Sequence, residues 1–303
     1  MLALEGITVL ILGGDKREIE LSKILEKLGA TVKLFGFEKY RSTDDGIGQS
    51  IISEKKLHKA LSRCDVLITP LSGINAAGEI SAPYALQKLV IDEQLINTFT
   101  NVKLLFSGTV APVFKKKLSG KVQIIETGDL DQIAFLNAVP TAEGAIAYAI
   151  CNSDITIHGS ESFVLGFGRC GSVLARSLQG LSARVSVFTR SSKSQAAAKA
   201  YGTNSFPLNA LLKEIHKADY IFNTVPSVVL TADLLAKAKK NCLLIDLASF
   251  PGGIDFLAAQ QLGLKGKRLP GIPGKIAPKS AGRILGDVYP SLIINKLKGG
   301  ENK

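Results

Sequence analysis

The sequence predicts an α/β protein with two Rossmann-like, doubly wound lobes that contain parallel sheets and are joined by hinge helices around a cleft. Apolar runs such as Leu104–Phe106 and Leu243–Ile245 are short and bounded by polar residues, as buried strands of a parallel sheet are. Stretches with helical periodicity separate the strands, which is typical of β-α-β units. The chain of 303 residues is also longer than one hydrophobic core supports, so two domains are expected.

Two helical segments mark the expected domain boundaries. Pro140 and Thr141 open an alanine-rich helix, because proline is tolerated at a helix start and a hydroxyl can cap one. A second helix around Ser280–Asp287 is expected to return to the first lobe. We therefore assign residues 1–138 and about 280–303 to the first lobe and residues 139–279 to the second lobe.

The first lobe begins with a predicted strand at Ile7–Leu12. When the chain is aligned with itself, Gly13 falls on Gly166, whereas Asp15 and Glu18 fall on later glycines of the second lobe. Carboxylates at a helix N-terminus complement the helix dipole and would repel a pyrophosphate. The first lobe is thus predicted to have a Rossmann-like shape without a dinucleotide.

We expect the first lobe to bind the substrate, since ligands of open α/β sheets bind beyond the carboxyl ends of the strands. Predicted strands at Asp65–Thr69 and Leu104–Phe106 lead into small hydroxyl residues and glycines, whose O–H and N–H groups suit carboxylate binding. Helix capping and ordinary turn chemistry explain the same residues and stay open as alternatives. The candidate substrate-binding residues are Asp15, Lys16, Arg17, Ser72, Gly73, Ser107, Thr109 and Thr141.

The second lobe carries a complete dinucleotide fingerprint, Gly166-Phe167-Gly168-Arg169-Cys170-Gly171. The apolar strand Phe163–Leu165 precedes it, a helical pattern follows, and the strand Arg184–Phe188 completes the β-α-β unit. The first glycine makes the turn, the second admits the phosphates and the third allows close helix packing. With N–H donors at the helix N-terminus, this setting predicts a site for a pyrophosphate.

The residues at the end of the return strand favour NADP(H) over NAD(H). An NAD site usually ends this strand with an acid, whereas a site for the 2′-phosphate offers arginine and hydroxyls. Here no acid is present, although Arg190 and Lys193 in a merely solvated turn remain the alternative. The predicted cofactor contacts are Gly166, Phe167, Gly168, Arg169, Cys170, Gly171, Thr189, Arg190, Ser191, Asn223, Thr224, Val225, Pro226, Asp246, Ala248 and Ser249.

Composition argues against several other classes of protein. Apolar residues make up 46% of the chain and charged residues 21%, which argues against disorder. The net charge of +11 arises from dispersed lysines and arginines without a nucleic-acid motif, so an anionic substrate or an acidic partner explains it better than nucleic acid. No apolar run approaches the ~20 residues of a membrane span, and the early first strand leaves no room for a signal peptide. Four cysteines without metal spacing indicate a reduced, cytoplasmic protein with no metal site.

The histidines disfavour ordinary 2-hydroxy-acid dehydrogenation. That reaction needs an acid/base, commonly a histidine steadied by a carboxylate. His58 and His216 lie in charged helical stretches, and His158 lies in a turn before the fingerprint strand. None of the three is expected at a strand end that faces the cleft.

The motifs together resemble one family, the A subunit of dipicolinate synthase from endospore-forming bacteria. The resemblance runs through nearly the whole chain. It is most specific at Pro140–Ala145 and Asp154–Ser160, and Gly13–Arg17, Pro70–Gly73 and Pro270–Lys275 support it.

The resemblance implies an NADP-dependent oxidoreductase that converts a hydroxy-tetrahydrodipicolinate, from a branch of the lysine pathway, into dipicolinate during sporulation. It implies work in the cytoplasm of the mother cell with the flavoprotein-like B subunit of dipicolinate synthase, and it allows a homo-oligomer. Lys16 and Arg17 would hold substrate carboxylates, and Glu143 is the candidate for moving a proton. Two alternatives stay open: an alanine-dehydrogenase-type enzyme for another anionic metabolite, and a dinucleotide-sensing module without chemistry.

Overall fold

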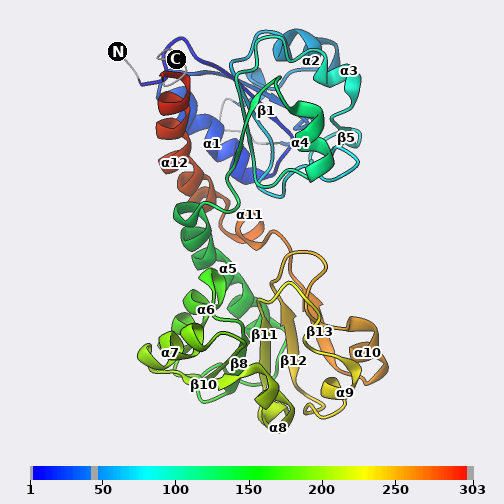
Figure 1. Cartoon of the computed structure of the whole chain (residues 1–303), viewed down its shortest axis with the longest axis vertical. Helices are drawn as coiled ribbons and strands as arrows, with labels where there is room; N and C mark the ends of the chain where they lie inside the picture. Colours follow the sequence, from blue (N-terminus) through cyan, green and yellow to red (C-terminus); the bar gives the residue numbers. More distant parts are fainter. Residues whose placement is uncertain (1–2, 42–46, 299–303) are drawn as a thin grey trace. The chain divides into compact units, whose positions relative to one another are not determined.

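The computed structural model describes residues 3–41 and 47–298. The chain divides into two compact units: unit 1 comprises residues 1–133 and 277–303, and unit 2 comprises residues 134–276. Each unit contains one parallel sheet of five or six strands with helices packed against it (Figure 1). The prediction of two Rossmann-like lobes with parallel sheets is confirmed.

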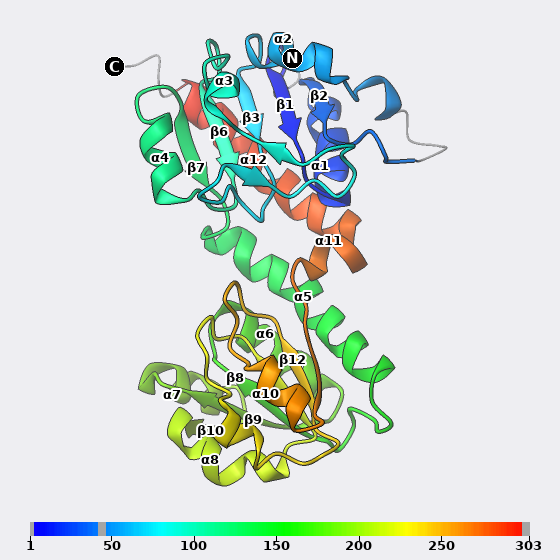
Figure 2. The same ribbon diagram turned by 90° about the vertical axis from the view of Figure 1, so that its right-hand side faces the viewer.

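Unit 1 has the strand order β2-β1-β3-β6-β7, which Figure 2 shows from the side, and a small antiparallel hairpin of β4 and β5. Its elements are β1 (Thr8–Leu12), α1 (Lys16–Lys27), β2 (Thr31–Phe35), the 3-10 helix η1 (Ile47–Gln49), α2 (Glu54–Leu61), β3 (Val66–Ile68), β4 (Glu79–Ile80), β5 (Leu89–Val90), α3 (Glu93–Ile96), β6 (Leu104–Ser107), α4 (Pro112–Leu118), β7 (Gln123–Glu126) and α12 (Pro278–Lys298).

Unit 2 has the strand order β10-β9-β8-β11-β12-β13. Its elements are α5 (Asp131–Cys151), β8 (Glu161–Leu165), α6 (Arg169–Gly180), β9 (Arg184–Thr189), α7 (Ser192–Ala200), β10 (Asn204–Pro207), η2 (Leu208–Ala210), α8 (Leu211–Glu214), η3 (Ile215–Lys217), β11 (Tyr220–Asn223), α9 (Ala232–Leu235), β12 (Leu243–Asp246), α10 (Phe256–Gln261), β13 (Lys265–Arg268) and α11 (Ile272–Ile276). The first residues of α5, up to Ile133, belong to unit 1.

Both sheets are buried on their two faces. In β1, Val9 and Ile11 belong to one apolar cluster, whereas Leu10 and Leu12 belong to the cluster on the opposite face. The central strand of unit 2 divides its side chains between two clusters in the same way. Alternate residues of a strand point to opposite faces, so a strand covered on both sides needs an unbroken apolar run.

Helix α5 corrects a prediction, because it begins at Asp131 and Pro140 lies in its interior. Ala138 and Ala142 are buried on either side of the proline, so packing holds the helix together where the proline removes one N–H donor. Thr141 does not cap a helix start, and its hydroxyl donates to the carbonyl of Asn137. The apolar α5 is long enough to cross a membrane, but half of its most apolar window is buried inside the protein.

Helix α12 is longer than the predicted segment at Ser280–Asp287. It lies beside α1 in unit 1, so the expected return of the chain to this unit is seen (Figure 1). A Cβ atom at Gly282 would lie 2.5 Å from Cβ of Glu20 and 2.8 Å from the carbonyl oxygen of Arg17. Glycine at this position therefore lets the two helices approach closely.

Candidate functional site

The glycine loop of unit 2 leaves a helix N-terminus open. Gly166 has φ +90°, and a Cβ at Gly171 would lie 2.3 Å from the carbonyl oxygen of Gly166. Gly168 is the N-cap of α6 without a side-chain cap, and a Cβ there would meet no atom within 4 Å. A helix N-terminus without a side-chain cap and the open space at Gly168 fit a pyrophosphate.

The side chains inside this loop have different surroundings. Phe167 is buried, and its ring lies 6.1 Å from the ring of Tyr201. Burial raises the pKa of the Cys170 thiol to about 12, which keeps the thiol protonated and unreactive at neutral pH. The loop therefore offers backbone groups rather than reactive side chains to a ligand, as the fingerprint predicts.

The end of β9 presents Arg190 to solvent. Thr189 is nearly buried, and Ser191 caps α7 by accepting a hydrogen bond from the N–H of Ser194. Arg190 is exposed, and no ion pair among the described residues includes it. Its guanidinium is therefore available to an anion.

Asn223 and Asp246 lie at the ends of β11 and β12, but their side chains are buried rather than open to a cofactor. Nδ2 of Asn223 donates to Oδ1 of Asp246 at 2.8 Å and to the carbonyl of Val225. Asp246 also accepts hydrogen bonds from the N–H groups of Ala248 and Gly253. These two side chains therefore hold the adjoining loops at the carboxyl ends of β11 and β12. Thr224, whose hydroxyl donates to the carbonyl of Leu165, and the exposed Pro226 and Ser249 also lie at this edge.

The corresponding helix start in unit 1 is closed by its own side chains. Asp15 accepts a hydrogen bond from the N–H of Arg17, and Oε2 of Glu18 accepts one from the N–H of Asp15. Nε and Nη2 of Arg17 both donate to the Asp15 carboxylate, at 3.0 and 2.9 Å. We expected the guanidinium of Arg17 to bind a substrate carboxylate, but it is bound to Asp15 instead. Arg17 is also only 7% exposed.

This cluster shifts the pKa values of both acids. Burial raises the pKa of Glu18 to about 7, the negative charge of Asp15 adds to the rise, and Arg17 opposes it. Burial alone would raise the pKa of Asp15, but the hydrogen bonds and charge of Arg17 outweigh it and lower that pKa. Oε1 of Glu18 is buried without a hydrogen-bond partner. Glu18 is therefore a carboxyl group that can hold a proton near neutral pH.

The hairpin of β4 and β5 and the loop inside it lie against the ends of β1 and β2. The N–H of Gly14 donates to the carbonyl of Ser81, and the N–H of Lys39 donates to the carbonyl of Tyr84. A Cβ at Gly36 would lie 2.6 Å from Cδ1 of Leu89. The chain itself thus fills the place where a Rossmann domain holds a dinucleotide.

Three of the predicted substrate residues line one pocket of about 630 Å³ in unit 1: Ser72, Gly73 and Thr109. Asn75 and Lys88 line it as well, and Lys88 pairs with Glu79 at 2.5 Å. Ser107 does not line this pocket: it is fully buried, and its hydroxyl donates to the carbonyl of Thr109.

The remaining predicted residues do not line this pocket. Lys16 is exposed on the first turn of α1. Thr141 and the exposed Glu143 belong to α5 in unit 2. Within the predicted substrate set, Ser72, Gly73 and Thr109 therefore line a pocket and Asp15 and Arg17 form a closed pair. Lys16, the buried Ser107 and Thr141 of unit 2 belong to neither.

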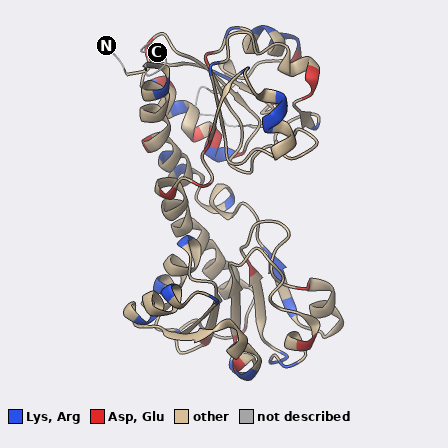
Figure 3. Cartoon of the chain, viewed as in Figure 1, with Lys and Arg blue, Asp and Glu red and all other residues tan. Residues whose placement is uncertain are grey.

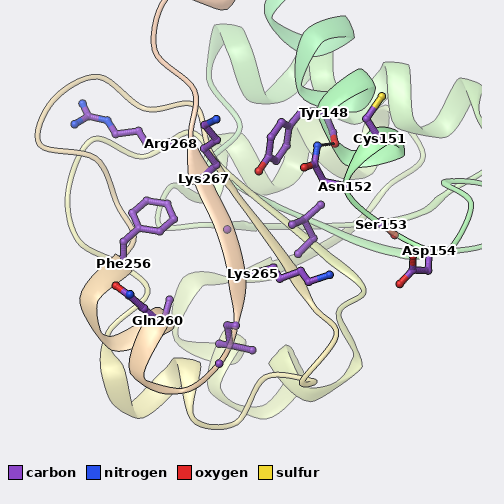
Figure 4. Close-up of a pocket in the computed structure, with 15 residues that line it drawn as sticks. Tyr148, Cys151, Asn152, Ser153, Asp154, Phe256, Gln260, Lys265, Lys267 and Arg268 are labelled. Carbon is purple, nitrogen blue, oxygen red and sulfur yellow. Dashed lines mark hydrogen bonds between the residues drawn. The ribbon is translucent and has the colours of Figure 1, made fainter.

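The largest cavity described in unit 2, about 1020 Å³, contains none of the predicted site residues. It lies along the edge strand β13 and the end of α5, where Lys267 lies 6.0 Å above the ring of Tyr148 (Figure 4). Its lining includes Leu243 and Lys265, the first residues of β12 and β13. The lining continues along β13 to its last residue, Arg268. Volume alone does not indicate the site, because ligands of α/β sheets bind beyond the carboxyl ends of the strands, which only one end of this cavity reaches.

Charges are spread over both units (Figure 3). Three consecutive lysines lie in α4, Lys115 to Lys117, and two of them pair with Glu126 and Glu93. Among the described residues, no group of three or more histidine, cysteine, aspartate or glutamate side chains could hold a metal ion.

Comparisons with known proteins agree with this architecture. Residues 8–127 match the model of the N-terminal domain of the dipicolinate synthase A subunit. Residues 147–249 match the NAD-binding domain of D-isomer specific 2-hydroxyacid dehydrogenases, which supports a nicotinamide dinucleotide as cofactor and an oxidoreductase as the class of protein. A D-lactate dehydrogenase from Escherichia coli is 16% identical with a TM-score of 0.62 over 97% of this chain and 98% of that chain, a likeness of fold alone.

Closer relatives share one name. The A subunit of dipicolinate synthase from Bacillus subtilis is 32% identical over 96% of this chain and 97% of that protein. The crystal structure of the A subunit from Bacillus halodurans is 34% identical and covers 96% of this chain and 98% of that chain, with a TM-score of 0.85. The identity and the almost complete coverage show that the chain belongs to the family of dipicolinate synthase A subunits.

Proposed function

We propose that this chain is the dehydrogenase component of a dipicolinate synthase and oxidises a hydroxy-tetrahydrodipicolinate with NADP⁺ to dipicolinate, with loss of water. The observation that carries the proposal is the uncapped N-terminus of α6 behind Gly166 and Gly168. Family membership supplies the substrate class. The exposed Arg190, at a strand end without an acid, supports NADP⁺ over NAD⁺.

The proposed reaction requires little acid–base catalysis by the protein. The substrate loses one water molecule and two hydrogens, the latter as a hydride and a proton, and forms an aromatic ring. The hydride acceptor would be supplied by a bound NADP⁺. The residues of the chain have to orient the ring and exclude water. Glu143 remains our candidate for the proton acceptor, because it is an exposed carboxylate in one of the most family-specific segments.

Substrate recognition is proposed for the pocket of unit 1. Ser72 and Thr109 are exposed there, and their hydroxyls can donate to a carboxylate. A pocket at the carboxyl ends of β3 and β6 also argues against a module that only senses a dinucleotide, which has no use for a second ligand site. Because the relatives are named as one part of a larger enzyme, we propose the B subunit of dipicolinate synthase as partner, in the mother-cell cytoplasm of a sporulating bacterium.

A coupled assay tests the proposal. The purified chain, with and without the B subunit, is mixed with NADP⁺ and freshly generated hydroxy-tetrahydrodipicolinate, and the absorbance of dipicolinate is followed. We expect dipicolinate to accumulate with stoichiometric NADPH. Product formation that is independent of NADP⁺ and NAD⁺, or none either with or without the partner, would contradict the proposed function.

A further inference from the structure

Two side chains that the sequence did not single out meet at the carboxyl edge of the unit 2 sheet. Arg268 is the last residue of β13, and its register partner in β12 is Asp246. Phe250 follows two residues after Ala248, in the loop beyond β12. The guanidinium carbon of Arg268 lies 5.5 Å from the centroid of the Phe250 ring. This distance is within the range of a cation–π contact.

Arg268 has no anionic partner among the described residues. Asp246, the acid next to it in the sheet, is already bound by Asn223 and by the N–H groups of Ala248 and Gly253. No ion pair or hydrogen bond in the described part of the chain involves the Arg268 side chain, and its Nε is buried without an acceptor. A buried donor without a partner is uncommon in proteins, and it marks a place where a ligand can supply the acceptor.

The Phe250 ring is 84% exposed. Single exposed apolar side chains are common, but this ring has a cation beside it and lies next to Ser249, a proposed cofactor contact. Gly252, with φ +92°, packs tightly in the same loop, because a Cβ there would lie 2.6 Å from Asp246 Oδ2 and 3.5 Å from Arg268 Nε. The loop therefore holds the Arg268 guanidinium and the Phe250 ring in place while the ring stays exposed to solvent.

Arg268 lines one end of the large cavity along β13, but its side chain points away from the part of the cavity beside Tyr148. Figure 4 shows it leaving the end of the strand on the side away from Tyr148, whereas Lys267 points toward Tyr148. Successive residues of a strand point to opposite faces, which accounts for the difference. Lys267 is therefore a matched control for Arg268: it is the neighbouring cation on the other face.

We propose that Arg268 and Phe250 form a recognition site for a planar ring that carries a carboxylate. The guanidinium donates two hydrogen bonds to the carboxylate, and the exposed phenyl face stacks on the ring. The assignment rests on the proposed function, since it identifies the part of the substrate that unit 2 binds beside the cofactor. It concerns unit 2 alone and requires nothing of the pocket in unit 1.

The test measures binding of pyridine-2,6-dicarboxylate to the full-length, NADP(H)-loaded protein by calorimetry, together with KM for the substrate. Arg268→Gln should weaken binding and raise KM by about 10- to 100-fold, the range for hydrogen bonds to a charged group. Phe250→Leu should weaken binding by roughly 3- to 10-fold, the range for loss of an aromatic pair. Neither change should alter the affinity for NADP(H) by more than about twofold, since neither residue belongs to the glycine loop.

Two controls separate recognition from structural support. Lys267→Gln should leave both readouts within about twofold of the parent, because its charge lies on the other face. The uncharged pyridine-2,6-dicarboxamide should bind the parent and Arg268→Gln equally weakly, because it offers no carboxylate. If the parent forms dipicolinate but Arg268→Gln and Phe250→Leu retain its KM, the inference is overturned and the proposed function stands. If the parent itself forms none, the proposed function fails first.

Discussion

The two glycine loops of this protein start from the same strand-turn-helix geometry and reach opposite results. In unit 2 the helix after Gly168 has no side-chain cap, so its N-terminus is open to a ligand. In unit 1 the helix after Asp15 has a complete capping box, and the carbonyl of Ser81 accepts a hydrogen bond from the N–H of Gly14. The difference teaches that a Rossmann-like loop binds a dinucleotide only when the protein leaves its helix donors unsatisfied.

The largest expected effect comes from giving the unit 2 loop the acid of the unit 1 loop. Gly168→Asp places a carboxylate against the phosphates, which costs about 4 kcal/mol at an effective dielectric constant of 20. We expect NADP(H) affinity to fall roughly 1000-fold in a fluorescence titration. Gly180→Asp, at the other end of α6, should bind NADP(H) with the affinity of the parent. Unchanged affinity in Gly168→Asp would show that the nucleotide binds elsewhere.

The closed loop of unit 1 should make the stability of this protein depend on pH. The folded-state pKa of Glu18 is about 7 against an ordinary value of 4.5. A carboxyl group whose pKa is raised by folding stabilises the folded state at pH values below its pKa in the unfolded chain. This stability is lost as the pH rises from 4.5 through 7. The loss approaches about 3 kcal/mol.

Glu18→Gln removes this titration and keeps an oxygen for the N–H of Asp15. The variant should be more stable than the parent at pH 8, by at most about 3 kcal/mol, and much closer to it at pH 5. Denaturant unfolding at the two pH values measures the difference. Glu54→Gln, an exposed acid in the first turn of α2, serves as the control. Equal pH profiles for Glu18→Gln and the parent would refute the raised pKa.

The choice between NADP(H) and NAD(H) sharpens the comparison within unit 2. The parent should bind NADP(H) more tightly, and Arg190→Asp should cost about 1.5–3 kcal/mol in NADP(H) binding, the range for hydrogen bonds to charged groups. Affinity for NAD(H) should change much less. Lys199→Asp, an exposed cation in the last turn of α7, should change neither. A parent that prefers NAD(H) would contradict this assignment.

The smallest expected effect concerns the pocket of unit 1. Ser72→Ala removes one hydroxyl donor and should raise KM for the substrate by roughly 3- to 10-fold, about 0.5–1.5 kcal/mol. NADP(H) affinity should not change. Ser62→Ala, whose hydroxyl donates to the carbonyl of Lys59, is the control. A KM of Ser72→Ala equal to that of the parent would remove this residue from the substrate site.

Sequence reasoning located the strand ends but not all of the side chains that act there. Asn223 and Asp246 were predicted as cofactor contacts because they end apolar strands, yet each is engaged by the other. Arg268 escaped notice because Lys265–Arg268 is a short, polar strand without an apolar signal. Its position beside Asp246 arises from parallel register, which a local pattern does not reveal.

The sequence by itself determined the parallel sheets, the glycine turn at Gly166 and the acids that replace glycines after Gly13, because apolar periodicity and turn chemistry act over a few residues. Tertiary structure alone decided which polar groups remain free. The Asp15–Arg17 pair, the hairpin against Gly14 and the unpaired Arg268 all depend on contacts of folded side chains with one another or with distant segments. Burial supplies the physical reason, since a polar group removed from water must find its partner wherever the fold brings one.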